Sequence, residues 1–299
     1  MLALLALASA CSTSQTVVVE APASELTAVP FFPQNRYQCG PAALATVLVE
    51  RGVDITPEVL VPEVYLPERR GSLQLELIAS TRRHGRLPYP LAQDLAMLLE
   101  EVAAGSPVLV LQNLGVAWLP RWHYAVVIGY DPAAESVLLR SGRQARRQES
   151  LSRFDRAWSL ADRWALRILR PGEVPATGDP AVYLRAIMDS RELLSESDLH
   201  QALAAGVEHW PEAANLSFAA ANHARDMGQV DRALNFYEHA LSADAEHPGA
   251  LNNLADLLLS IGEVERARKL IDQALSLVPE GSRLRTVIEE TSREISEQE

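Results

Sequence analysis

The stretch QNRYQCGPAA, residues 34–43, decides the fold of the first half of the chain. Pro41 stands near the start of an apolar run that Gly52 closes, and this order of proline and glycine is typical of a helix. The run is apolar on nearly every side, so we expect a buried helix. Cys39 then lies at the helix N-terminus, where unpaired N–H groups and the helix dipole lower the pKa of a thiol.

Gln34 precedes Cys39 by five residues, a spacing that lets a side-chain amide face an oxyanion beside the sulfur. A nucleophile at a helix start with an upstream amide is the arrangement of a cysteine hydrolase. The alternative is that Cys39 is a small buried hydrophobic residue, as most lone cysteines are.

Two motifs resemble one known family. Residues 34–43 resemble the nucleophile motif of the bacteriocin-processing, double-glycine-leader cysteine peptidases, and WHYAVVIGYD, residues 122–131, resembles their histidine motif. These are papain-like peptidase domains that are often found on ABC exporters. The resemblance covers roughly residues 29–170 and implies an α+β fold, with N-terminal helices followed by an antiparallel sheet. It also implies that His123 takes the thiol proton and returns it to the leaving amine.

The third catalytic residue of that family is not evident. The related peptidases carry an Asp followed by Pro on the strand after the histidine strand, where residues 140–142 of this chain read Arg-Ser-Gly. Asp131 lies roughly 26 Å from His123 along an extended strand and is expected in a hairpin turn. The imidazole is therefore oriented by another polar group, or by none. The candidates are Ser141, Asn113 and Gln112.

Two other features of this domain carry a structural interpretation. His84 ends a predicted helix at residues 73–83, where positive side chains suit the helix dipole, so we do not expect it to be the catalytic base. The basic cluster at residues 143–147 is expected to be a solvated loop, with the binding of an acidic substrate segment as the lesser alternative. Its members are Arg143, Arg146 and Arg147.

Hydrophobic periodicity outlines the rest of this domain. It predicts a short helix from Pro57, helices at 73–83 and 91–104, and strands at 108–112, 123–130, 136–141 and 164–168.

The C-terminal part repeats itself. Residues 171–180 contain three prolines and two glycines and form a linker. Beyond them, Gly-x-Val-x-Arg-Ala at 228–233 recurs at 262–267, an offset of 34 that is typical of tetratricopeptide repeats. We expect an all-α repeat domain over 181–299, with a degenerate repeat at 181–211 and a polar capping helix at 286–299. The repeats would bind a protein partner or merely support the first domain.

Charge separates the same two domains. The 299 residues carry a net charge of −12; residues 1–180 hold 17 arginines and 18 acidic residues, whereas residues 181–299 hold 10 basic and 21 acidic residues. Such a balance argues against nucleic-acid binding. The sequence has no zinc-type Cys/His spacing and no phosphate-binding glycine motif, so neither a metal nor another cofactor is expected.

The N-terminus predicts a membrane anchor. MLALLALASA, residues 1–10, is an apolar run that ends in small residues before Cys11 and resembles a truncated bacterial lipoprotein signal. Cys11 would then be lipidated, residues 11–28 would form a tether, and the protein would lie at the cell envelope, on the periplasmic face of the outer membrane. The alternative is an ordinary apolar N-terminus.

The resulting hypothesis is a stand-alone envelope cysteine peptidase that acts through Cys39, His123, Gln34 and Ser141, with a peptide or protein as substrate. A second hypothesis is a non-catalytic adaptor lipoprotein that binds peptides or proteins, which the missing aspartate favours. A third is acyl transfer from the same acyl-enzyme to an amine.

Overall fold

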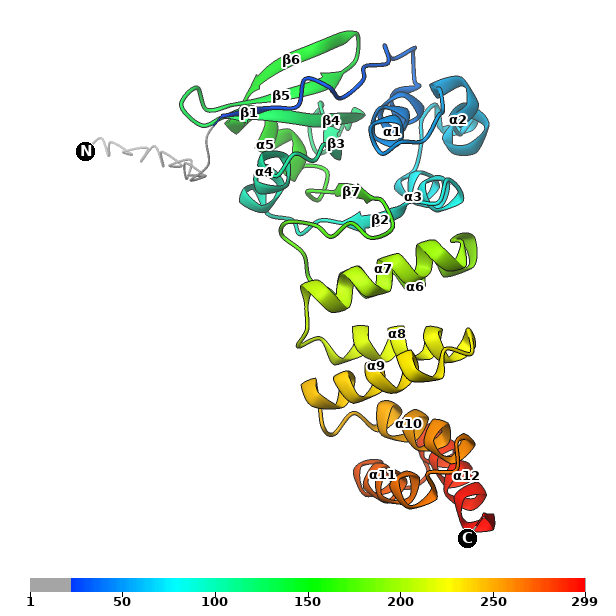
Figure 1. The fold of residues 1–299 in the computed structure, drawn as a ribbon. Coiled ribbons are helices and arrows are strands. Elements are labelled where there is room, and N and C mark those ends of the chain that lie inside the picture. Colours follow the sequence, from blue (N-terminus) through cyan, green and yellow to red (C-terminus); the bar gives the residue numbers. More distant parts are fainter. Residues whose placement is uncertain (1–22, 299) are drawn as a thin grey trace, which may run out of the picture. The chain divides into compact units, whose positions relative to one another are not determined.

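The structure, a computed structural model, describes residues 23–298 (Figure 1). The predicted signal at 1–10, the anchor at Cys11 and most of the tether lie outside these residues. The chain forms two compact units. The first contains the described residues up to Glu50, Asp54–Ser72 and Leu91–Leu166, and the second contains Arg51–Val53, Leu73–Pro90 and the chain from Arg167 onward.

The helix that carries the cysteine is α1, Cys39–Glu50. Every residue from Gly40 to Leu48 is buried, which confirms the buried helix expected from its all-round apolar character. It packs on α2 and on strands β3, β4 and β5. The other helical segments of the first unit are α2 (Pro57–Val64), η1 (Pro67–Arg69), α4 (Leu95–Ala103) and α5 (Leu151–Ser159).

An antiparallel sheet contains the strands of the first unit, to which β7 contributes Ala165 and Leu166, and this confirms the predicted fold class. The strand order is β7-β3-β4-β5-β6, and β1 pairs with β4. Val126 of β4 lies opposite Arg140 of β5, and Gln112 of β3 lies opposite His123 of β4. The bounds are β1 (Ser24–Glu25), β3 (Val108–Asn113), β4 (Trp122–Asp131), β5 (Ser136–Ser141), β6 (Gln144–Ser150) and β7 (Ala165–Leu169).

The expected loop at 143–147 was wrong. These residues turn at Gly142, which has φ +62°, and enter strand β6, where Arg147 lies opposite Leu139. The segment QARRQES has no apolar alternation because an edge strand faces solvent on much of its surface, and charged side chains are favoured there. The following α5 packs on β3, β5 and β6, and its Phe154 and Trp158 are fully buried.

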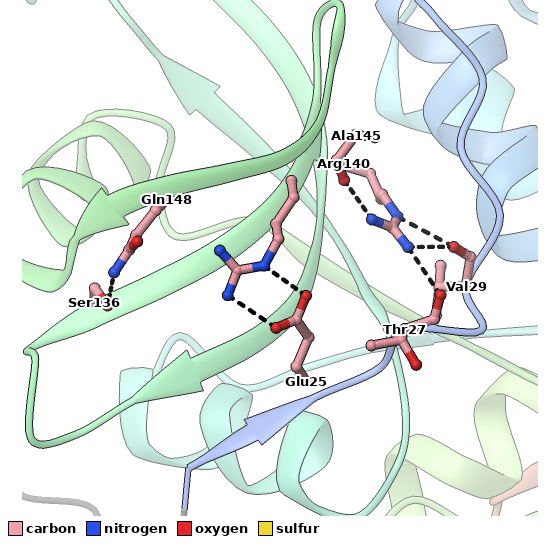
Figure 2. Close-up of polar contacts among 8 residues, drawn as sticks. Glu25, Thr27, Val29, Ser136, Arg140, Ala145 and Gln148 are labelled. Atoms are coloured by element: carbon pink, nitrogen blue, oxygen red, sulfur yellow. Dashed lines mark hydrogen bonds and ion pairs between the residues drawn. The ribbon is translucent and has the colours of Figure 1, made fainter.

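Two arginines of the β5–β6 hairpin hold the N-terminal segment (Figure 2). Arg146 forms a two-point ion pair with Glu25 of β1, at 2.8 and 2.9 Å. Arg140 donates to the carbonyl oxygen of Val29 at 2.6 and 3.1 Å and to that of Thr27 at 3.2 Å. The chain that leads to Gln34 is therefore tied to the hairpin that ends near the histidine.

The second unit is mostly helical, and the expected repeats are present as helix pairs. Alanines spaced by 34 residues, Ala221 with Ala255 and Ala240 with Ala274, are fully buried. The turns between paired helices contain Gly228 and Gly262 at positive φ. The elements are α3 (Gln74–Arg83), β2 (Leu87–Pro90), α6 (Pro180–Met188), η2 (Arg191–Leu193), α7 (Glu196–His209), α8 (Ala214–Asp226), α9 (Val230–Ala243), α10 (Pro248–Ser260), α11 (Val264–Leu277) and α12 (Arg283–Glu297).

Two boundaries differ from the sequence prediction. The helix expected at 91–104 begins at Leu95 because Asp94 caps it, accepting a hydrogen bond from the N–H of Met97. The last helix begins at Arg283, since Ser282 caps it in the same way. Among the described residues, no helix combines the length and apolar character needed to span a membrane.

Candidate active site

Cys39 is the first residue of α1 and is half-buried. Burial raises the pKa of its thiol, and backbone hydrogen bonds from Tyr124, Gly40 and Cys39 itself oppose that rise without cancelling it. The lowered pKa expected from the helix start was wrong, because loss of solvation outweighs the helix terminus. The resting group is therefore a neutral thiol.

His123 stands at the beginning of β4 with its imidazole against β5. Its Nε2 atom lies 2.8 Å from the Oγ atom of Ser141, which ends β5 and is 2% exposed. When Nε2 carries the ring proton, its N–H donates a hydrogen bond to this hydroxyl. Nδ1 is then unprotonated and can accept a proton. Burial, followed by the charges of Arg147 and Arg121, lowers the pKa of His123 from 6.5 to about 4. The imidazole is neutral at pH 7 and can act as a base.

Gln34 is held by hydrogen bonds to β4 and to the turn that follows β5. Its side-chain Nε2 donates to the carbonyl oxygen of Tyr124 at 3.2 Å, and its backbone N–H donates to that of Gly142 at 2.9 Å. Tyr124 thus contacts both Gln34 and Cys39, and it directly follows His123 in the chain. Cys39 and Gln34 therefore both contact the backbone of the residue that follows His123 in the chain.

The three candidate orienters of the imidazole have different environments. Asn113 is committed to the β3–β4 connection, because its Oδ1 atom accepts the N–H groups of Gly115 and Arg121, both at 2.9 Å. Gln112 lies opposite His123, is 1% exposed, and its Nε2 atom has no partner among the described residues. Only Ser141, of the three, has a hydrogen bond to the ring.

The remaining acid and base candidates lie in structural positions. Asp131 accepts hydrogen bonds from the N–H groups of Ala133 and Ala134, at 2.9 and 3.1 Å, so it builds the β4–β5 turn as its position indicates. His84 is the C-cap of α3, and it belongs to the second unit.

Sequence reasoning missed Tyr124, which contributes backbone groups rather than side-chain chemistry. Burial, with the nearby Cys39, raises the pKa of its phenol well above the usual range, and its hydroxyl donates to the carbonyl oxygen of Ser72 at 3.3 Å. The influence of Arg121 and Arg147 on His123 was missed as well. The backbone contacts of Tyr124 leave no pattern in a sequence, because any residue type can supply them.

No group of three or more His, Cys, Asp or Glu side chains that could hold a metal ion occurs among residues 23–298. The polar groups at the site are instead a thiol, an imidazole, a hydroxyl and an amide. This set can carry out nucleophilic and acid–base chemistry.

Two parts of the chain match known families. Residues 26–165 match the Peptidase_C39 like family, and residues 224–289 match a tetratricopeptide repeat family. The chain therefore carries a peptidase C39-like domain followed by tetratricopeptide repeats. No curated protein matches it.

Several solved structures are similar to parts of the chain. One is described as a C39-like peptidase from Bacillus anthracis, with 18% identity, a TM-score of 0.42, and coverage of 50% of this chain and 98% of that one. The type III secretion chaperone SycD of Yersinia enterocolitica, in complex with a peptide of the translocator YopD, has 17% identity, a TM-score of 0.34, and coverage of 40% and 88%. The first tetratricopeptide domain of Spaghetti, bound to an HSP90 peptide, has 14% identity, a TM-score of 0.36, and coverage of 40% and 90%.

Proposed function

We propose that the protein is a cysteine peptidase in which Cys39 attacks the peptide carbonyl and His123 carries the proton. The observation that supports this most directly is that the backbone of Tyr124, the residue after His123, contacts Cys39 at the start of a buried helix in a C39-like domain. The imidazole is held by Ser141, which gives it a fixed direction.

The neutral thiol and imidazole define the order of events. His123 accepts the thiol proton as the sulfur attacks, and the carbonyl oxygen takes the negative charge. The Gln34 amide and the N–H groups at the start of α1 are the donors available to that oxyanion. When the intermediate collapses, the C–N bond breaks, His123 returns the proton to the leaving amine, and a thioester remains. Water then attacks the thioester, with His123 again as the base, and restores the thiol.

Ser141 acts as a positioning residue in this proposal. Its hydroxyl fixes the ring but brings no negative charge to stabilise the imidazolium, unlike the aspartate of the related peptidases. We therefore expect a slower enzyme than one with a carboxylate at this position.

The repeats are proposed to recruit a protein or peptide. Stacked helix pairs give an extended surface, and residues 224–289 match a family of such repeats. We also propose that Cys11 anchors the protein at the cell envelope. The lipoprotein-like run at residues 1–10 supports this anchor.

Digestion of a defined peptide library, followed by mass spectrometry, tests the function. The wild type should cleave peptides, and Cys39→Ala and His123→Ala should each lower the rate at least 1,000-fold, because each removes a member of a unit that acts together. Ser141→Ala should lower it about tenfold, in line with the loss of one hydrogen bond.

Circular dichroism is needed to show that each variant is folded. A wild type that binds peptides without cleaving any would favour the adaptor hypothesis. Full activity of Cys39→Ala would exclude the proposed nucleophile.

A further inference from the structure

A cavity of about 390 Å³ lies in the first unit between the β3–β4 connection, β6 and α5. This size falls within the range of small-ligand sites. The hydrolytic mechanism leaves the cavity without a role. Its charged lining consists of four arginines and one glutamate: Arg121, Arg147, Arg153, Arg156 and Glu149.

Glu149 neutralises only part of the positive charge of this lining. Glu149 is buried and forms ion pairs with Arg153 at 3.1 Å and with Arg147 at 3.7 Å. Arg121 and Arg156 are exposed, and no acidic side chain in the described part of the chain forms an ion pair with either. The cavity therefore has two guanidinium groups available to an anion.

Two arginines of this cavity lie near His123 in the chain or in the sheet. Arg121 precedes His123 by two residues, and its backbone N–H is held by Asn113, which also lines the cavity. Arg147 lies opposite Leu139, two residues before the Ser141 that contacts the ring. The positive charges of Arg147 and Arg121 reach the imidazole, where they help to lower the pKa of His123.

We propose that this cavity binds the carboxylate of an acidic residue on the leaving-group side of the scissile peptide bond. The inference rests on the proposed peptidase function. His123 returns the proton to the leaving amine, so the residues that follow this amine lie close to the imidazole, and the charges of Arg147 and Arg121 reach that imidazole from the cavity. The guanidinium fork matches a carboxylate in shape and charge. A doubly charged phosphate is less suitable because the buried Glu149 lies in the same wall.

Paired peptides provide the test. We take a ten-residue peptide that the wild type cleaves, acetylated and amidated so that its ends are uncharged, and place Glu or Gln at each of the four positions after the scissile bond. At one of these positions kcat/KM for the Glu peptide should exceed that for the Gln peptide about tenfold. The double variant Arg121→Gln/Arg156→Gln should reduce this ratio to about one, whereas Arg69→Gln, an exposed arginine outside the cavity, should keep it.

Cleavage without a Glu preference, or a preference that the double variant keeps, would overturn the subsite and leave the peptidase function intact. Binding separates the two claims when cleavage is absent. Fluorescein-labelled versions of all library peptides are titrated with Cys39→Ala, and a Glu preference that depends on Arg121 and Arg156 would show that the cavity binds an acidic side chain even if the peptidase function failed. Arginine-dependent binding to phosphatidylglycerol vesicles, with no preference among peptides, would instead assign the cavity to a lipid headgroup and overturn the proposal.

Discussion

His123 and Cys39 illustrate at the residue scale how burial changes the chemistry that a motif suggests. The imidazole loses solvation and faces Arg147 and Arg121, all of which oppose its protonation. Burial likewise favours the neutral form of the thiol. The two groups are therefore both neutral near pH 7, and the proton moves between them only as the sulfur attacks. A preformed ion pair, common among catalytic cysteines, is not expected here.

A pH profile tests this arrangement. The base must be unprotonated, so kcat/KM should fall as the pH drops through about 4, the pKa of His123. Arg121→Gln removes one repulsive charge, so it should raise that pKa and move the acid limb to higher pH, while Arg69→Gln should leave the limb in place. An acid limb above pH 6 in the wild type would contradict the neutral pair.

The acid range needs a control for folding. The unfolded chain binds a proton at this histidine from about pH 6.5 downward, whereas the folded state does so only near pH 4. The free energy of unfolding therefore declines as the pH falls from 6.5 to 4. Circular dichroism across this range separates loss of activity from loss of fold.

At the scale of the element, close approach of β1 to β4 depends on Gly129. A Cβ atom at this position would lie 2.4 Å from the carbonyl oxygen of Ser24 and 3.0 Å from the Cα atom of Glu25. Both are backbone atoms, so a larger residue must displace β1 or bend β4, next to the irregular pairing between Val127 and Gly129. The β1 pairing and the ion pair of Glu25 with Arg146 depend on this contact.

Gly129→Ala should therefore destabilise the first unit by about 1–3 kcal/mol, the usual cost of overpacking. Chemical denaturation measures this change, and hydrogen exchange at the Leu26 N–H, which donates to Ile128, should become faster. Gly71→Ala is the matched control, since its Cβ would have an ordinary contact at 3.8 Å. Equal stability of both variants would show that β1 does not need the close approach.

The elements also show how far the sequence could predict the fold. Strands β3, β4, β5 and β7 have buried, apolar residues, and all four were found within one or two residues. β6 was missed because an edge strand does not need an apolar face, and β1 was missed because its two residues pair through the backbone. Burial of α1 followed from composition, whereas the caps that start α4 and α12 required the structure.

At the scale of the whole molecule, some residues of the candidate site could be found from the sequence and others only from the structure. The sequence singles out Cys39 and His123 as candidates because each stands in a motif with a specific pattern of neighbours. The sequence left three polar candidates for the imidazole, and distance in the folded chain distinguishes Ser141 from Asn113 and Gln112. The arginine-lined cavity could not be predicted, since three elements separated in sequence must meet to form it.

The two halves of the chain also carry different information. The first matches a C39-like domain and contains the site, whereas the second matches tetratricopeptide repeats. Nearly all of the net charge of −12 lies in residues 181–299, which hold 21 acidic and 10 basic residues. A partner that binds the repeat domain is therefore expected to be basic, whereas the cavity near His123 is proposed to bind an acidic group.

Capture of the acyl-enzyme is the most direct measurement of the central claim. The wild type is mixed with a cleavable peptide, quenched in acid within milliseconds to seconds, and digested for mass spectrometry. We expect the N-terminal fragment of the substrate as a thioester on the peptide that contains Cys39, with no adduct in Cys39→Ala. Cleavage without any adduct in the wild type, or an adduct on another residue, would contradict catalysis by this thiol.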